Sequence, residues 1–271
     1  MIIGHQKQIA LLKKRAETDK LSHAYLFTGE EKIGKKKVAL ELGPLLFEQS
    51  DLSLIEPLST GVIEINQIRE LIWKLSLKPF ISVPVPKIAI IDNAHLMTQE
   101  AQSALLKILE EPRGKTLFIL ITEFPEVLFP TILSRVQKIK FFPVKKEEIK
   151  EYLIKKGLKE EAAEEVSEFS NGKPGLAISL LLDPEKLKNQ KKIIKELMAL
   201  SQTNLSFRFQ YAKELSEKEN IKEILDIWLR YFRKEIYKFS NLIKQIQNIN
   251  FLILTTNANI RLALEALMLE F

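Results

Sequence analysis

The chain has 271 residues, 46% of them hydrophobic, and a net charge of +6, so it can bury a sizeable core in two or three domains. The positive charge suits a polyanionic neighbour and equally an ordinary lysine-rich surface, whereas the absence of cysteine excludes disulfides, thiolate zinc sites and cysteine nucleophiles. Because no apolar run approaches the roughly 20 residues of a membrane span and the first residues lack a signal-peptide core, we expect a cytoplasmic protein without a membrane partner.

The first half alternates short apolar runs with longer helical patterns, which is typical of a parallel sheet covered by helices. Strands are predicted at residues 23–28, 87–92, 116–122 and 138–142. Helices are predicted at residues 35–47, 65–77 and 99–109, the last of them capped by Thr98. An open α/β sheet of this kind binds ligands at the carboxyl ends of its strands.

The pattern changes near Pro143, after which no further strand is predicted. Three short helices are expected between residues 145 and 182, broken at Gly157 and at 171–175. Further helices are predicted at residues 191–199, 207–215, 221–239 and 260–269. We therefore expect an α/β domain over residues 1–143, a small helical domain over 144–183 and an all-α domain over 184–271.

Residues 29–36, Gly-Glu-Glu-Lys-Ile-Gly-Lys-Lys, have the glycine and lysine spacing of a phosphate-binding P-loop and directly follow the first predicted strand. Gly29, Gly34 and Lys35 fit that role. Lys36, however, stands where the loop needs a serine or threonine hydroxyl to hold Mg²⁺ on the nucleotide, and a cation there repels the metal. The alternative is a glycine-rich turn that persists because it packs well.

Four segments carry a resemblance to a known family, and they occur in the same order. They read His-Ala-Tyr-Leu-Phe-Thr-Gly at 23–29, Ile-Ile-Asp-Asn-Ala-His at 90–95, Ala-Leu-Leu-Lys-Ile-Leu-Glu-Glu-Pro at 104–112 and Pro-Thr-Ile-Leu-Ser-Arg at 130–135. In this they resemble the AAA+ subunits of clamp loaders, and most of all the delta-prime family of bacterial DNA polymerase III. The resemblance implies an AAA+ α/β domain, a helical lid and an all-helical carboxyl-terminal collar.

For the nucleotide site, the resemblance places Asp92 at the metal-binding strand end and Thr122 at a phosphate-sensing position, although a threonine ending a strand is as often only a cap. Asn93 stands where active members carry the glutamate that activates water, and Leu176 stands where they carry a lid arginine. With Lys36, these changes imply negligible intrinsic ATP hydrolysis. The vestigial site that could still bind ATP or ADP weakly consists of Gly29, Gly34, Lys35, Lys36, Asp92 and Thr122.

The resemblance further implies that no cofactor is required and that zinc is absent, because the family's four-cysteine module is replaced by a short stretch at residues 49–61. Ser134 and Arg135 match the Ser-Arg-Cys motif, in which the arginine reaches into the ATP site of a neighbouring subunit. Arginine suits this role because its planar, permanently charged guanidinium can donate to phosphate oxygens. Val136 replaces the motif's cysteine, which we expect to change packing alone; a surface arginine in an ordinary ion pair is the alternative interpretation.

The partners implied by the resemblance are the gamma or tau motor subunits and the delta subunit in a hetero-pentamer. The sliding clamp and primer-template DNA would be reached through the assembled complex. Two other interpretations remain open: an active motor subunit similar to gamma or tau, and a free-standing helical adaptor. Lys36, Asn93 and Leu176 argue against the motor, and the retained Ser134-Arg135 pair argues against the adaptor.

Overall fold

The computed structural model describes residues 2–47, 49–77, 85–112, 114–235, 237–255 and 259–271. The chain divides into two compact units, Met1–Ser179 and Leu180–Phe271. The first unit contains the α/β domain together with the short helices that follow it, so the finer division at residues 143 and 183 stays a prediction. Among the described residues, no helix combines the length and apolarity needed to cross a bilayer.

A five-stranded parallel sheet forms the centre of the first unit, in the order β2-β3-β4-β1-β5. The strands are β1 (Ala24–Thr28), β2 (Asp51–Ile55), β3 (Lys87–Ile91), β4 (Thr116–Thr122) and β5 (Gln137–Lys140). Four of them were predicted, and the parallel α/β architecture is confirmed. The sequence prediction missed β2 because this short edge strand is exposed or half-buried along its length and lacks the continuous apolar run of the central strands.

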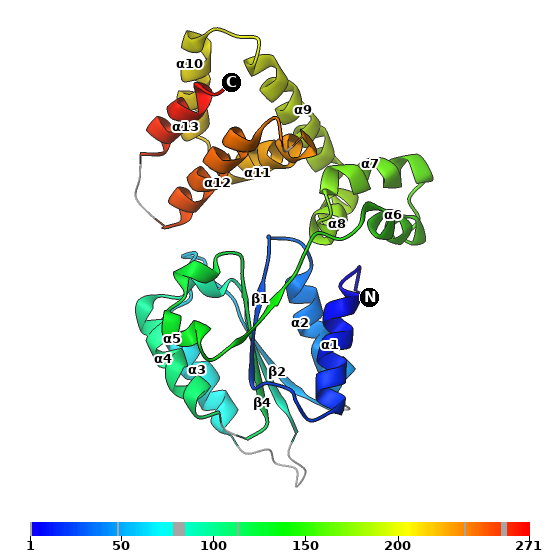
Figure 1. The fold of residues 1–271 in the computed structure, drawn as a ribbon, viewed down its shortest axis with the longest axis vertical. Coiled ribbons are helices and arrows are strands. Elements are labelled where there is room, and N and C mark those ends of the chain that lie inside the picture. Colours follow the sequence, from blue (N-terminus) through cyan, green and yellow to red (C-terminus); the bar gives the residue numbers. More distant parts are fainter. Residues whose placement is uncertain (1, 48, 78–84, 113, 236, 256–258) are drawn as a thin grey trace. The chain divides into compact units, whose positions relative to one another are not determined.

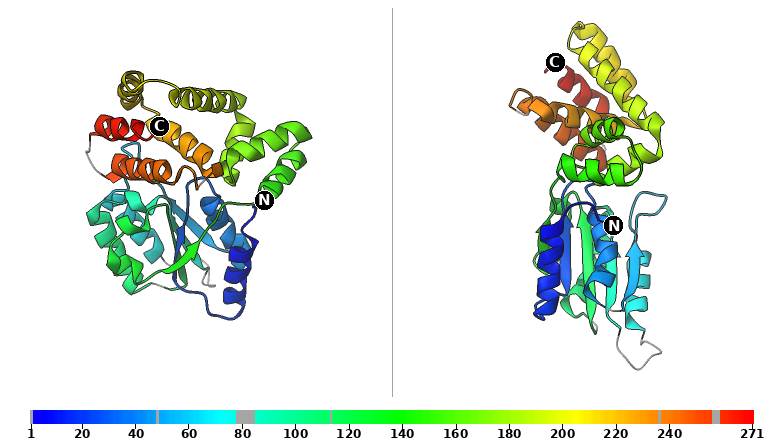
Figure 2. Two further views of the ribbon diagram at one scale, coloured as in Figure 1. Left: turned by 45° about the horizontal axis from the view of Figure 1, so that its top comes forward. Right: turned by 90° about the vertical axis from the view of Figure 1, so that its right-hand side faces the viewer.

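Helices cover both faces of the sheet (Figure 1 and the left view of Figure 2). Alternate residues of β1 point to opposite faces, so Tyr25 and Phe27 join one buried cluster and Ala24 and Leu26 another. The first cluster includes residues of α1 (Gln6–Glu17) and α2 (Lys35–Leu46); the second includes residues of α3 (Ile65–Ser76), α4 (Gln99–Glu110) and α5 (Pro130–Leu133). These two apolar layers fix the sheet between its helices.

The lid segment that follows β5 consists of α6 (Lys146–Lys155), α7 (Glu160–Ser170) and α8 (Pro174–Leu182). The second unit packs its helices around Trp228, which is fully buried. They are α9 (Pro184–Leu200), α10 (Leu205–Ser216), α11 (Ile221–Phe232), α12 (Ser240–Thr255) and α13 (Ile260–Met268). The helix predicted over residues 221–239 was too long: it ends at Phe232, a short 3₁₀ turn follows, and α12 is a separate helix that the prediction omitted.

Candidate functional site

The carboxyl ends of β1, β4, β3 and β2 lie side by side along one edge of the sheet because the strands are parallel and adjacent in that order. The loop after β1 carries Gly29, β4 ends at Thr122, Asp92 follows β3 and Glu56 follows β2. The structure therefore brings the predicted nucleotide-site residues together. It also adds Glu56, which sequence reasoning missed because its strand was missed.

The two glycines of the loop occupy backbone conformations that disfavour other residues. Gly29 has φ 142°, and a Cβ there would lie 2.6 Å from the Phe141 carbonyl oxygen and 2.7 Å from Ile33 Cδ1. Gly34 has φ 103° and directly precedes the first turn of α2. Packing and backbone conformation therefore account for both glycines, whether or not a phosphate binds.

The Lys35 side chain points back toward its own loop. The side chain is buried, and Nζ donates to the carbonyl oxygens of Gly29 at 2.5 Å and Glu30 at 2.6 Å. Burial lowers the pKa of Lys35 to about 8, and the nearby Glu123 and Asp92 carboxylates only partly oppose that shift. The ammonium that would neutralise a phosphate thus already has two acceptors.

Lys36 lies between two carboxylates. Its Nζ is hydrogen-bonded to Glu56 and lies 3.3 Å from Asp92 Oδ2. Burial disfavours the ammonium, but the Glu56 hydrogen bond and the Asp92 charge outweigh burial and raise the pKa of Lys36. Asp92 Oδ1 also accepts the Asn93 backbone N–H at 3.0 Å. These residues do not fit Mg²⁺, because a lysine ammonium already neutralises the carboxylate that would bind the metal.

No cluster of three or more histidine, aspartate or glutamate side chains suited to a metal ion occurs in the part of the chain that the structure describes. The hollow beside the loop has a volume of about 380 Å³. Its lining includes Lys35, Lys36, Asp92 and Glu123, but not Glu56.

The lid contacts the loop directly within the first unit. Lys173 is buried, and its Nζ lies 2.8 Å from Glu30 Oε2. The Gly175 backbone N–H donates to the Lys32 carbonyl oxygen at 2.8 Å, and a Cβ on Gly175 would lie 2.9 Å from that oxygen. Leu176 is buried and brings no charge to the site. Sequence reasoning missed Lys173 because a lysine at that position carries no motif signal, and its partner is far away in the sequence.

Thr122 is buried at the end of β4, where its hydroxyl has partners within the protein. Oγ1 accepts the Phe124 backbone N–H at 3.0 Å and lies 3.2 Å from His95 Nδ1. The threonine therefore caps the turn after the strand; a phosphate-sensing role stays a prediction.

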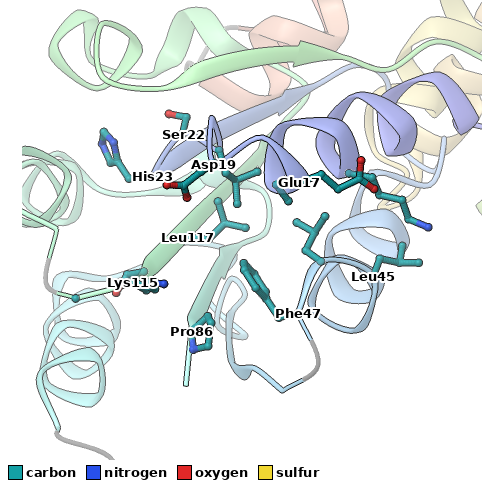
Figure 3. Close-up of a pocket in the computed structure, with 15 residues that line it drawn as sticks. Glu17, Asp19, Ser22, His23, Leu45, Phe47, Pro86, Lys115 and Leu117 are labelled. Atoms are coloured by element: carbon teal, nitrogen blue, oxygen red, sulfur yellow. The ribbon is translucent and has the colours of Figure 1, made fainter. Parts of the chain in front are cut away.

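A second hollow, of about 630 Å³, lies at the opposite edge of the sheet, where the strands begin (Figure 3). Its lining combines apolar side chains such as Phe47 and Leu117 with charged ones such as Glu17, Asp19 and Lys115. None of the predicted site residues lines it. The larger of these two hollows therefore contains none of the P-loop residues and is not a nucleotide site of the P-loop type.

Arg135 lies beyond the end of α5, and all of its polar contacts described here are with α4, α5 and the adjoining Ser134. Nη1 donates to the Thr131 carbonyl oxygen at 2.9 Å and to Ser134 Oγ at 3.2 Å, and Nη2 lies 2.8 Å from Glu110 Oε1. Val136 packs against the adjacent core cluster, as expected for the residue that replaces the motif's cysteine.

The sheet places Arg135 away from the chain's own P-loop. β5 begins at Gln137, which pairs with Tyr25 near the start of β1, whereas the P-loop follows the far end of β1. Arg135 thus belongs to the amino edge of the sheet, roughly a strand length of 15 Å from the loop. Its guanidinium cannot serve the chain's own candidate site.

Comparisons with known proteins agree with this architecture. Residues 4–51 and 46–145 match the family described as DNA polymerase III, delta subunit. The delta-prime subunit of DNA polymerase III from Bacillus subtilis is 31% identical over 250 residues, which cover 82% of this chain and 74% of that protein. The tau subunit of the same organism is 32% identical, but the match covers 52% of this chain and 28% of tau.

Two solved structures share the fold. A DNA polymerase III gamma subunit-related protein from Thermotoga maritima has a TM-score of 0.52 at 22% identity, covering 97% of this chain and 98% of that one. A variant of the RuvB protein of the same organism has a TM-score of 0.51 at 18% identity, covering 71% of this chain and 64% of that one. At such identities the likeness establishes the AAA+ fold alone.

Proposed function

The chain belongs to the family of DNA polymerase III delta subunits, and we propose that it is the non-hydrolysing, delta-prime-like stator of a clamp loader. In this role it supports ATP-driven loading of a sliding clamp onto primed DNA. It requires no cofactor of its own and carries no zinc. The observation that carries the proposal is the Lys36 ammonium held beside Asp92, in the place where an active P-loop binds its metal.

Loss of hydrolysis follows from three independent changes. Lys36 excludes the metal, Asn93 offers an amide that cannot take a proton from water, and Leu176 brings no charge from the lid. Each change removes a different part of transition-state stabilisation, and a few kcal/mol amounts to about a hundredfold or more in rate. Intrinsic ATPase activity is therefore negligible. Any residual ATP or ADP would bind weakly and without a metal.

Arg135 acts in trans, with Ser134 as its motif partner. The supporting observation is its place at the amino edge of the sheet, away from its own loop, with the guanidinium partly exposed. An arginine that one subunit inserts into the ATP site of its neighbour, called an arginine finger, can raise the rate of phosphoryl transfer by about a thousandfold or more. The neighbour is a gamma or tau motor subunit in a hetero-pentamer that also contains delta, with the clamp and primer-template DNA reached through the cytoplasmic complex.

The test measures DNA-stimulated ATP hydrolysis by the purified chain alone and by its complex with the motor subunit. We expect no steady turnover by the lone chain, and we expect Arg135→Ala to lower turnover in the complex by about a hundredfold or more at the site it serves. Arg15→Ala, which removes a surface arginine that is hydrogen-bonded to Gln137, is the matched control. Turnover by the lone chain would instead identify an active motor subunit, and an unchanged Arg135→Ala complex would remove the finger.

A further inference from the structure

Arg135 pairs with an acidic residue, Glu110, to which the resemblance of the 104–112 segment assigns no role. Glu110 is the last residue of α4, and its carboxylate lies 2.8 Å from Arg135 Nη2. We propose that Glu110 is a positioning residue, which holds the Arg135 guanidinium in the orientation that presents its unused N–H groups to the phosphates of a neighbouring subunit. This inference rests on the proposed trans-acting role of Arg135 and deepens it.

The first argument is a count of donors. A guanidinium has five N–H groups. Nη1 uses two of them on the Thr131 carbonyl and the Ser134 hydroxyl, and Nη2 uses one on Glu110. Nε–H and one Nη2–H have no partner among the described residues and can donate to phosphate oxygens.

The second argument concerns the number of elements that hold the group. Thr131 and Ser134 belong to the turn that carries Arg135 itself, so they fix the guanidinium only relative to that turn. Glu110 belongs to a different helix, and three acceptors on two elements fix the plane of the group. A free arginine side chain loses rotamer freedom when it takes its place beside the phosphates, and a positioned one loses less. The expected effect is therefore on rate.

The third argument is that Glu110 stands on a rigid support. α4 buries Leu105, Ile108 and Leu109 against the sheet, and Thr98 caps its first turn. The buried Gln102 of α4 accepts the Phe129 backbone N–H at 2.8 Å, which ties the start of α5 to α4. The carboxylate and the arginine are thus held by two helices that are fixed to one another.

Glu111 supplies a matched control. It is the next residue in the chain, it is exposed, and no ion pair joins it to Arg135 in the described structure. Glu111→Gln therefore makes the same change in charge at almost the same place while leaving the Glu110–Arg135 pair intact.

The experiment measures ATP turnover by the complex of the full chain with its motor subunit, using Glu110→Gln, Glu110→Asp, Arg135→Ala and the double variant Glu110→Gln/Arg135→Ala. We expect Glu110→Gln to lower kcat by about three- to tenfold with the KM for ATP unchanged, since the group is misplaced but still present. Glu110→Asp should recover part of that loss, Glu111→Gln should have no effect, and the double variant should match Arg135→Ala.

The outcomes separate the two proposals. An unchanged or raised kcat for Glu110→Gln, together with a large loss for Arg135→Ala, overturns the positioning role and leaves the finger in place. A double variant slower than Arg135→Ala also overturns it, because Glu110 would then act independently of the arginine. No loss for Arg135→Ala defeats the proposed function itself, and the positioning role with it.

Discussion

The P-loop region and the Arg135 region use charged residues in opposite ways. At the P-loop, Lys35 donates to carbonyl oxygens of its own loop, Lys36 lies between two carboxylates, and Lys173 of the lid is paired with Glu30. At the amino edge of the sheet, Arg135 is partly exposed and keeps two N–H groups after its contacts with Glu110 and its own turn. The P-loop region pairs its donors within the protein, whereas Arg135 leaves some N–H groups without a partner among the described residues.

If the chain is the proposed non-hydrolysing subunit, this difference explains how a nucleotide-binding architecture persists without its chemistry. Buried charges are stable only when they are paired, so a P-loop without nucleotide needs acceptors from the protein itself. Glu30, Glu56 and Asp92 supply them. The loop therefore keeps its shape for structural reasons, whereas the Arg135 turn, in the proposed function, presents its guanidinium to a neighbouring subunit.

The largest expected effect concerns the Arg135 region. Arg135→Lys keeps the positive charge but loses the planar fork, so turnover of the complex should still fall by about a hundredfold or more. The free energy of unfolding of the chain should change by less than about 0.5 kcal/mol, because the ion pair is exposed. ATPase assays and urea unfolding of the same preparation check both. A large loss of stability without loss of turnover would make Arg135 a structural residue.

The next largest effect concerns the P-loop region and its contact with the lid. Glu30→Ala leaves the buried Lys173 ammonium unpaired, so the free energy of unfolding should fall by about 2 to 4 kcal/mol in urea titrations. Glu70→Ala is the control, because Glu70 pairs with Lys74 at 2.9 Å on an exposed face of α3, and its loss should cost less than about 0.5 kcal/mol. Equal costs for the two variants would show that the lid contact is no stronger than a surface pair.

A pH titration tests the burial of Lys35. Its pKa is about 8 in the folded chain against 10.5 for an ordinary lysine, so between these values the unfolded chain binds more protons and stability rises with pH. Relative to Lys35→Met, the wild-type free energy of unfolding should therefore increase by about 2 to 3 kcal/mol from pH 7.5 to 10.5. Lys37→Met, at an exposed position two residues further along α2, is the control. Parallel curves for wild type and Lys35→Met would contradict the burial argument.

The smallest effect concerns residual nucleotide. Millimolar ADP should raise the melting temperature by no more than about 2 °C, and by the same amount with Mg²⁺ or with a chelator, because Lys36 holds the metal's place. Lys36→Thr should make that shift depend on Mg²⁺. Thermal unfolding followed by fluorescence measures both. A Mg²⁺-dependent shift in the wild type would mean that the ammonium leaves Asp92 when nucleotide binds.

Much of the fold was predictable because its signals are local. The central strands are continuous apolar runs, Thr98 caps its helix as expected, and Gly29 and Gly34 mark the loop. The edge strand β2 and the break after Phe232 have no comparable local signal, because both depend on what packs against them. A half-exposed edge strand and a helix that ends without glycine or proline leave weak traces in sequence.

The sequence by itself determined the AAA+ architecture, the lysine at position 36, the uncharged Leu176 and the Ser134-Arg135 pair, because each is a matter of residue type and spacing along the chain. Only the tertiary structure decided which carboxylates hold Lys36, that Lys173 fastens the lid to Glu30, and that Arg135 meets Glu110 at the edge of the sheet away from its own loop. These ion pairs join residues 20 to 143 positions apart. Strand order and helix packing bring such residues together, and neither can be read from the spacing of residues along the chain.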